Sequence, residues 1–209
     1  RVYLPRLHRA EADAAAHLAR LAAAESEMPT FRLWTRRDIL NEMPTGLAYT
    51  EEQQRAVVEA LKRPVSVITG GPGTGKTTMV KAIVSVARNQ LYEVLLTAPT
   101  GKAAKRLSET TGVPAATIHR TLGVEPKSGR FIANEHHPLR GHVIIVDESS
   151  MLDVELAAAL LRALPTGAHV VFVGDVDQLP AVGPGNVLRD LITSEAGPVT
   201  RLTTIWRQS

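Results

Sequence analysis

The sequence predicts an α/β protein in which helices cover both faces of a parallel β-sheet. Short runs rich in Val and Ile alternate with helix-prone segments from residue 50 onward, the order typical of repeated βα units. The apolar runs are nearly continuous, as in strands buried on both faces. One run ends in a glycine-rich loop and another in two acidic residues. Both features follow the end of a strand, the edge of a parallel sheet where ligands gather.

These patterns place the expected elements. A helix is expected to begin at Thr50, with Glu51 and Glu52 in its first turn and Gln53 completing a capping box. Residues 112–140 are less regular and are expected to form long loops. Strands are expected over 65–69, 93–98, 142–147 and 168–174, and further helices over 77–89, 101–110, 153–164 and 187–193.

Residues 1–46 are expected to be a helical lead-in, or linker, from a preceding region. Residues 6–24 are rich in Ala and Leu and predict a packing helix. Residues 29–43 predict a loop and a short amphipathic helix. The turn-forming residues 44–46 indicate a boundary. The main domain is therefore expected over residues 47–209.

The composition is that of a soluble globular protein. Of 209 residues, 44% are hydrophobic and 22% are charged, and no apolar run approaches the ~18 residues of a membrane span. The chain has no signal peptide and starts with Arg1 rather than Met, so it is expected to be a piece of a longer protein. Because it contains no cysteine, a reducing compartment is favoured. The expected location is cytoplasmic, of bacterial type.

The net charge of +3 is small but unevenly distributed. Residues 101–140 carry seven Lys or Arg and three Glu residues, a local excess of four positive charges, together with three His residues. A basic face of this kind can bind phosphates. A merely solvated surface is the alternative.

Residues 70–77 match the phosphate-binding loop template G-x-x-x-x-G-K-[ST], also called Walker A. Its glycines permit a tight turn that points backbone N–H groups at phosphates. Lys76 is expected to reach the β- and γ-phosphates, and the Thr77 hydroxyl to ligate Mg²⁺. The sequence therefore predicts a P-loop NTPase. Nucleotide contacts are expected from Gly71, Pro72, Gly73, Thr74, Gly75, Lys76, Thr77 and Thr78.

Two further strands end in polar clusters. Asp147, after the run 143–146, is expected to hold Mg²⁺ through water, because Mg²⁺ dehydrates reluctantly. Glu148 is expected to orient or deprotonate the attacking water. After the run 170–174, Gln178 is expected to sense the γ-phosphate, and the aspartates 175 and 177 to support the metal or to pair with basic residues. An acidic turn and a plain strand-to-turn segment are the respective alternatives.

Four segments together resemble the first motor domain of a RecD-like DNA helicase, in the 5′-to-3′ branch of helicase superfamily 1 (superfamily 1B, exonuclease V alpha-subunit-like). The resemblance covers residues 47–209. It implies a RecA-like sheet, ATP and Mg²⁺ as cofactors, single-stranded DNA as partner, and a role in DNA repair or recombination. The four segments are residues 70–78, 97–107, 147–151 and 174–185.

The resemblance also assigns roles to single residues. Gln53 matches the glutamine that reads adenine, for which a plain helix-surface glutamine is the alternative. His119 and Arg120 match a second DNA contact, and a structural His119 is the alternative. Arg207 matches the arginine that touches the γ-phosphate and would act in catalysis with Lys76, Glu148 and Gln178. The segment that grips the single strand is matched by Pro99, Thr100, Gly101 and Lys102.

A motor of this family requires a second RecA-like domain, which the 209 residues do not contain. The chain by itself is therefore expected to bind nucleotide weakly and to unwind nothing. Subunits of a nuclease complex are further candidate partners. The alternative is another nucleic-acid-directed P-loop ATPase, of loader or terminase type, which would not be expected to carry the patterns at 99–102 and 174–185.

Overall fold

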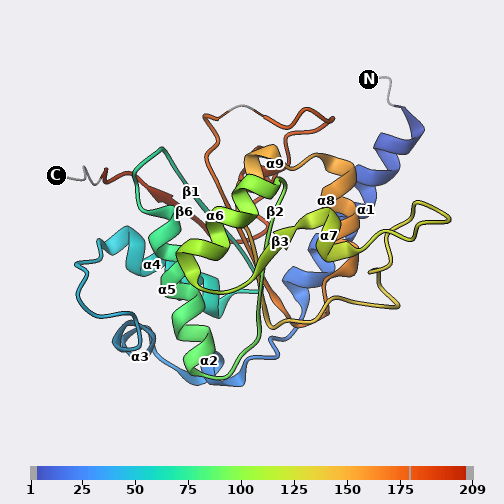
Figure 1. The fold of residues 1–209 in the computed structure, drawn as a ribbon. Helices are drawn as coiled ribbons and strands as arrows, with labels where there is room; N and C mark the ends of the chain where they lie inside the picture. The colour runs from blue at the N-terminus through green and yellow to red at the C-terminus, as the bar shows by residue number, and fades with distance from the viewer. Residues whose placement is uncertain (1–3, 179, 206–209) are drawn as a thin grey trace.

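The computed structural model describes residues 4–178 and 180–205 (Figure 1). Within them, six parallel strands form one sheet in the order β3-β2-β4-β5-β1-β6. Since all strands run in one direction, their carboxyl ends share one edge, toward the top of Figure 1. The strands are β1 (Val65–Gly70), β2 (Val94–Ala98), β3 (Ala115–Thr117), β4 (Val143–Val146), β5 (His169–Gly174) and β6 (Val199–Leu202).

Helices cover both faces of the sheet and create two apolar cores. Side chains alternate across each strand, so Val65 and Val67 of β1 enter one core and Ile68 enters the other. This arrangement confirms the predicted fold class. The core containing Ile68 lies under α2 (Pro29–Leu33), α3 (Arg36–Asn41), α4 (Glu51–Lys62), α5 (Lys76–Asn89) and α6 (Gly101–Thr111). The other lies under α1 (Pro5–Ala23), α7 (Ile118–Leu122), α8 (Val154–Ala163) and α9 (Val187–Thr193).

The order of the central strands differs from their order in the chain. Strand β5 lies between β1 and β4, pairing Gly174 with Thr69 on one side and Phe172 with Val146 on the other. Three segments singled out in the sequence therefore leave the sheet side by side. They are the glycine-rich loop after β1, the acidic pair after β4 and the polar turn after β5.

Side-chain caps define where several helices begin. The Thr50 hydroxyl accepts from the Gln53 N–H at 3.3 Å, and Gln53 Oε1 accepts from the Thr50 N–H at 3.1 Å. The predicted capping box of α4 is thus confirmed. Thr100 and Thr117 begin α6 and α7 in a related way, each accepting from the backbone N–H three residues later.

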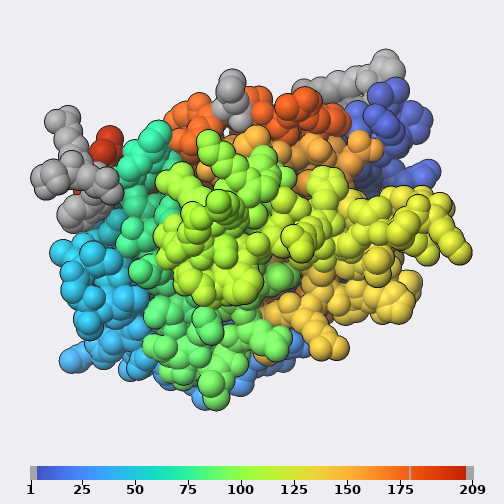
Figure 2. Space-filling model, in the orientation of Figure 1, coloured from blue at the N-terminus to red at the C-terminus, as the bar shows by residue number. Residues whose placement is uncertain are grey.

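The prediction of loops throughout residues 112–140 is wrong for 115–122, which form β3 and α7. Strand β3 reads Ala-Ala-Thr and contains no apolar run; its pairing with β2 decides its conformation. Strand β6, which the prediction lacks, has only four residues and exposes Arg201. Residues 123–141 are irregular as expected: one bridge between Val124 and Phe131 closes a hairpin, which projects at the right of Figure 2.

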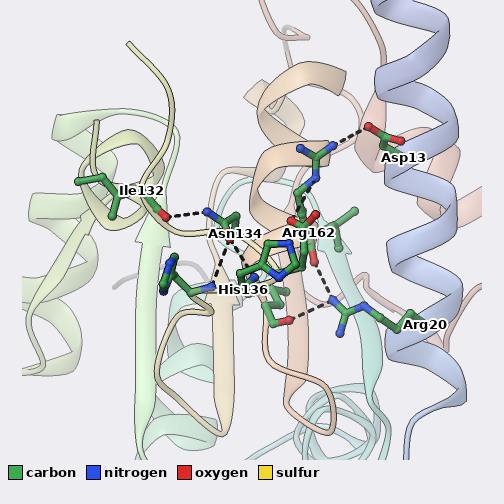
Figure 3. Close-up of polar contacts among 10 residues, drawn as sticks. Asp13, Arg20, Ile132, Asn134, His136 and Arg162 are labelled. Atoms are coloured by element: carbon green, nitrogen blue, oxygen red, sulfur yellow. Dashed lines mark hydrogen bonds and ion pairs between the residues drawn. The ribbon is translucent and has the colours of Figure 1, made fainter. Parts of the chain in front are cut away.

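The lead-in segment packs onto the α/β fold. Phe31 of α2 and Ile39 of α3 are fully buried in the first core, and α1 lies along α8 (Figure 3). The domain boundary at residue 46 stays a prediction. Arg162 of α8 joins α1 to the irregular segment 123–141, with Nη2 2.6 Å from an Asp13 carboxylate oxygen and Nε 3.8 Å from a Glu135 carboxylate oxygen.

Arg20 of α1 caps the carboxyl end of α8. Its guanidinium donates to the Leu161 and Leu164 carbonyls, both at 3.0 Å (Figure 3), and to the Thr166 hydroxyl at 2.6 Å. Carbonyls in the last turn of a helix have no partner within the helix, so Arg20 satisfies groups that α8 cannot satisfy itself. Burial lowers the pKa of Arg20, which stays charged.

The substitution Arg20→Ala should lower the free energy of unfolding by about 1–3 kcal/mol, because it leaves the part-buried carbonyls of α8 without this donor. Chemical denaturation of the chain measures the change. Arg9→Ala, at an exposed position of the same helix, is the control and should shift stability by less than about 0.5 kcal/mol. Equal effects of the two substitutions would contradict the capping role.

His169 is a buried titratable side chain, 1% exposed, at the start of β5. Its Nδ1 lies 3.2 Å from the Ala60 carbonyl oxygen, whereas Nε2 has no hydrogen-bond partner among the described residues. Burial lowers the pKa of His169 from 6.5 to about 4. The folded protein therefore holds a neutral imidazole, with the proton on Nδ1 facing the carbonyl.

This shift makes stability depend on pH. Below pH 6.5 the unfolded chain binds a proton that the folded chain excludes, so the free energy of unfolding should fall between pH 6.5 and about 4, by on the order of 3 kcal/mol. His169→Leu should flatten this part of the pH profile, measured by chemical denaturation at each pH. Exposed His137→Ala should keep the slope of the unsubstituted chain. An unchanged slope in His169→Leu would contradict the assignment.

Candidate nucleotide-binding site

The phosphate-binding loop joins β1 to α5 and is held by contacts within itself. Thr74, only 3% exposed, donates through Oγ1 to the Gly71 carbonyl at 2.9 Å. Gly75 has φ of 89°, in the left-handed region that favours glycine. A Cβ on Gly75 would also lie 2.6 Å from Gln53 Nε2. Glycine before Lys76 is therefore required both by the backbone and by the neighbouring helix.

Lys76 begins α5 and turns its ammonium group back over the loop. Its Nζ donates to the carbonyls of Gly70 at 2.5 Å and Gly71 at 2.9 Å. Burial lowers the pKa of Lys76, and nearby carboxylates, Asp175 most strongly, oppose that shift. The charge is thus fixed at the loop whose N–H groups are expected to hold phosphates.

A cavity of about 710 Å³ opens between the loop, the start of α4 and the acids after β4. Its volume lies within the roughly 300–1,000 Å³ typical of small-molecule and cofactor sites. Of the predicted nucleotide contacts, all but Gly71 line it. The lining residues are Leu47, Ala48, Tyr49, Gln53, Pro72, Gly73, Thr74, Gly75, Lys76, Thr77, Thr78, Arg106, Asp147, Glu148 and Gln178.

The acidic pair after β4 enters this cavity. Asp147 Oδ1 accepts from the Glu148 N–H at 2.9 Å, and burial raises the pKa of Asp147 despite that bond. Glu148 has φ of 52° and ψ of 39°, a left-handed conformation that is uncommon outside glycine and clusters at functional sites. Because of this turn, both carboxylates line the nucleotide cavity.

The cavity contains oxygen donors suited to Mg²⁺. The Thr77 hydroxyl and the Asp147 carboxylate belong to the same lining, and Mg²⁺ in phosphate sites takes few protein ligands in addition to phosphate oxygens and water. Among the described residues, no group of three or more His, Cys, Asp or Glu is arranged to hold a metal. The donor set therefore fits a metal that arrives with a triphosphate.

Gln178 reaches the cavity from the strand between the loop and the acids. The turn after β5 is closed by Asp175, 2% exposed, whose Oδ1 accepts from the Asp177 N–H at 3.0 Å and whose carbonyl accepts from the Gln178 N–H at 3.2 Å. Gln178 is exposed and lines the cavity, whereas exposed Asp177 does not. The predicted γ-phosphate sensor thus lies on the cavity wall.

Gln53 is not a surface glutamine, because only 4% of it is exposed. Its Oε1 accepts from the Thr50 N–H, and its Nε2 donates to the Thr74 carbonyl at 3.4 Å, joining α4 to the phosphate-binding loop. An amide has two N–H donors and two acceptor lone pairs. One donor and one lone pair therefore remain for a ligand in the cavity that Gln53 lines.

The segments predicted to bind DNA lie along the same edge of the sheet but outside the cavity lining. Residues 99–102 follow β2, and residues 118–120 follow β3. The two strands pair side by side, with Ala98 opposite Thr117. The Thr97 and Thr121 hydroxyls lie 3.3 Å apart and join β2 to α7. The fold thus brings two segments, separated in the chain, to neighbouring positions.

Their side chains are available to a partner. Gly101, Lys102, His119 and Arg120 are exposed, and Pro99 and Thr100 are half-buried. The His119 ring also packs on Phe131 of the projecting hairpin, with ring centroids 5.7 Å apart.

One predicted site residue, Arg207, lies outside the described residues. The chain that leads toward it is fixed to α4: the Thr203 N–H and hydroxyl donate to the Glu52 carboxylate at 2.9 and 2.8 Å. These bonds lower the pKa of Glu52. Glu52 directly precedes Gln53, so this attachment lies beside the nucleotide cavity.

The sequence interpretation missed two kinds of lining residue. One side of the cavity is lined by the segment before α4, which contains Leu47, Ala48 and Tyr49. The sequence had indicated only the turn at 44–46 in this region, as a domain boundary. Burial raises the pKa of Tyr49. Arg106 lines the cavity from α6; its sequence position, four residues after the segment 99–102 assigned to DNA, gave no indication that it lines the nucleotide cavity.

The fold and site define a P-loop nucleotide-binding domain. A family model described as an AAA domain matches residues 53–184, and the chain belongs to this family. Within it the chain is a RecD-like motor domain. It is 40% identical over 210 residues to the ATP-dependent RecD2 DNA helicase of Deinococcus radiodurans, covering all of this chain. It is 38% identical over 214 residues to the RecBCD enzyme subunit RecD of Mycobacterium tuberculosis, covering 91% of this chain.

The matched part of these relatives is short: 28% of the Deinococcus protein and 36% of the mycobacterial subunit. Among solved structures, the Pif1 helicase from Candida albicans has a TM-score of 0.56 and 26% identity, covering 78% of this chain and 41% of that one. A Bacteroides Pif1 in complex with ADP-AlF4 shares the fold, with a TM-score of 0.50, 22% identity and coverage of 78% and 44%. In the described part of the chain, no helix has the length and apolar character needed to cross a membrane.

Gly75→Ala should lower the free energy of unfolding by at least about 1–2 kcal/mol, the cost of a left-handed conformation in a residue with a Cβ. The new methyl group would also contact Gln53 Nε2. Gly71→Ala is the matched control in the same loop, because a Cβ there meets nothing within 4 Å. Denaturation without nucleotide measures both; an equal loss in the two variants would contradict the assigned role of Gly75.

Proposed function

We propose that this domain is the ATP-hydrolysing motor of a DNA helicase that moves 5′ to 3′ on single-stranded DNA, in DNA repair or recombination. One observation carries the proposal: the nucleotide cavity and the two exposed segments assigned to DNA follow carboxyl ends of strands in one sheet. A change at the nucleotide can thus act on DNA through elements that share this edge. The proposal includes that this chain is part of a longer protein, which would carry the full helicase activity, because the chain spans only 28% and 36% of the two relatives.

The proposed chemistry depends on positioning and charge. The N–H groups of the phosphate-binding loop hold the phosphates, while Lys76 exchanges its loop carbonyls for phosphate oxygens. Gln53 uses its remaining donor and lone pair to read adenine. Thr77 and Asp147 hold Mg²⁺, which neutralises charge on the phosphates when bound. Glu148 orients water and accepts its proton.

Gln178 and Arg207 are proposed to contact the γ-phosphate. Loss of that phosphate removes their common ligand, and a second RecA-like domain facing this one would then separate and advance along the strand. Candidate partners of the longer protein are single-stranded DNA and, where it acts in an assembly, subunits of a nuclease complex.

A loader- or terminase-type ATPase is the second candidate function. It accounts for the phosphate-binding loop and the acidic pair but not for the exposed segment 99–102 beside residues 118–120. The pairing of β2 with β3 brings these segments together and favours the translocating motor.

Single-stranded DNA should stimulate ATP hydrolysis by the longer protein, and a 5′ overhang should support strand separation better than a 3′ overhang. Lys76→Ala should reduce ATP turnover by about 10²–10³-fold, because a charged phosphate contact is lost.

Glu148→Gln should retain ATP binding and lose turnover, because the amide cannot accept the proton of the attacking water. Lys81→Ala, exposed on the same helix as Lys76, is the control. ATP turnover with and without DNA is the measurement.

Three outcomes would contradict the proposal. Turnover that does not respond to single-stranded DNA would favour the second candidate. Turnover retained in Lys76→Ala would contradict the phosphate site itself. Robust strand separation by residues 1–209 alone would contradict the need for a second domain.

A further inference from the structure

Arg106 is a cation in the nucleotide cavity that the proposed chemistry has not used. It lies on α6 and lines the cavity together with Asp147 and Glu148. Burial is the main cause that lowers the pKa of Lys76 and raises that of Asp147; the charge of Arg106 makes a smaller contribution to both, and in each case it favours a lower pKa. The guanidinium therefore lies within electrostatic reach of the ammonium that binds phosphate and of the carboxylate expected to hold Mg²⁺.

The charges of the cavity show what Arg106 contributes. Four charged side chains line it: Lys76 and Arg106 are positive, and Asp147 and Glu148 are negative. Without Arg106 the lining would carry a net charge of −1, in a place that must accept a polyanion. Asp175, which acts on Lys76 from just outside the lining, adds to the negative side. A second cation offsets this repulsion between the lining and the ligand.

The guanidinium is not engaged by the acids around it. In the described part of the chain, the Arg106 guanidinium makes no ion pair within 4.0 Å and no hydrogen bond; only the backbone carbonyl of Arg106 accepts one, from the Thr110 hydroxyl at 2.8 Å. The residue is exposed. By contrast, Lys105 on the same helix pairs with Glu109 at 3.8 Å. Arg106 thus has all five of its N–H donors free for a ligand.

The guanidinium of Arg106 is suited to bind a phosphate group. A guanidinium presents its donors in a planar fork that matches the oxygens of a phosphate. In the proposed function the phosphate-binding loop would hold the inner phosphates, and Asp147 and Glu148 would lie nearest the terminal phosphate. Arg106 lines the same cavity as these two acids, acts electrostatically on Asp147, and is carried by α6, which packs against α5.

Helix α6 links Arg106 to the segment assigned to DNA. Thr100 caps this helix, and Lys102 is four residues before Arg106, so the two cations lie on one side of the helix about 6 Å apart along its axis. A displacement of the amino end of α6 by DNA would move Arg106 with it, because α6 is one continuous helix of 11 residues.

We propose that Arg106 binds the γ-phosphate of ATP from within this domain and, through α6, makes turnover depend on DNA held at residues 99–102. The inference rests on the proposed ATPase function and adds to it a phosphate-binding residue that distinguishes ATP from ADP. Lys76 contacts both nucleotides, whereas Arg106 contacts the nucleotide that retains the terminal phosphate.

The test uses the longer protein and the variants Arg106→Ala and Arg106→Lys, with Lys105→Ala as the control on the same helix. Equilibrium binding of a non-hydrolysable ATP analogue and of ADP is measured first. Arg106→Ala should lower the preference for the ATP analogue by about 10-fold or more, the effect of losing a charge-assisted hydrogen bond. Arg106→Lys should recover part of it, because the charge remains and the fork is lost. Lys105→Ala should match the unsubstituted protein.

ATP turnover and DNA binding complete the test. In Arg106→Ala, kcat at saturating DNA should fall by about 10-fold or more, while affinity for single-stranded DNA without nucleotide stays within about 2-fold, since the lost contact is with ATP. Equal losses for the ATP analogue and ADP would overturn the inference, as would weaker DNA binding with an unchanged nucleotide preference. A rise in DNA-independent turnover would also overturn it, because Arg106 would then restrain Glu148 rather than bind phosphate. If the unsubstituted protein showed no stimulation by DNA, the proposed motor function would fail, and the preference for the ATP analogue over ADP would still decide the role of Arg106.

Discussion

The placement of β5 between β1 and β4 is the constraint on which the site depends. It brings the phosphate-binding loop, Gln178 and the acidic pair to one cavity although about 100 residues of chain separate them. Burial on both faces fixes the register: Phe172 fills one core and Val173 the other. A slip of one residue would exchange these side chains between cores and would move Asp175 away from Lys76. The packing of the two cores therefore determines the geometry of the chemistry.

Two charged side chains of the cavity are partly desolvated. Burial lowers the pKa of Lys76 and raises that of Asp147, so each charge is disfavoured where it lies. A bound triphosphate with Mg²⁺ would give each a counter-charge, and the proposed ligand would thus relieve two desolvated groups at once. The loop is already shaped for it, since Gln53 donates to the Thr74 carbonyl and Thr74 donates to the Gly71 carbonyl without any ligand contact. Pre-organisation of this kind reduces the ordering that binding must impose.

Local patterns were sufficient for the parts of the fold that are specified locally. The runs at 65–69 and 170–174 are buried and β-branched, and the loop at 70–77 has a spacing that few other structures require, so both were predictable. Strand β3 was not, because Ala-Ala-Thr pairs only where β2 offers an edge. Arg106 was missed for a related reason: its helix was correctly expected, but the packing of α6 on α5 decides that it faces the nucleotide. The order of the strands in the sheet was likewise not predictable from local patterns, because it depends on pairing between segments far apart in the chain.

The separation between the nucleotide cavity and the segments assigned to DNA imposes a physical requirement. Strands β2 and β3 lie at one end of the sheet, and β4 and β5 stand between them and the phosphate-binding loop of β1. The sheet itself is buried on both faces and resists deformation, so a signal between the two sites has to pass through elements that lie on it. Helix α6 satisfies this condition, since its first turn belongs to the segment predicted to bind DNA and its second contributes Arg106 to the cavity. In the proposed arrangement α6 carries Lys102 near the DNA and Arg106 near ATP. Movement of this one helix would then be sufficient to couple DNA binding to ATP binding within the domain.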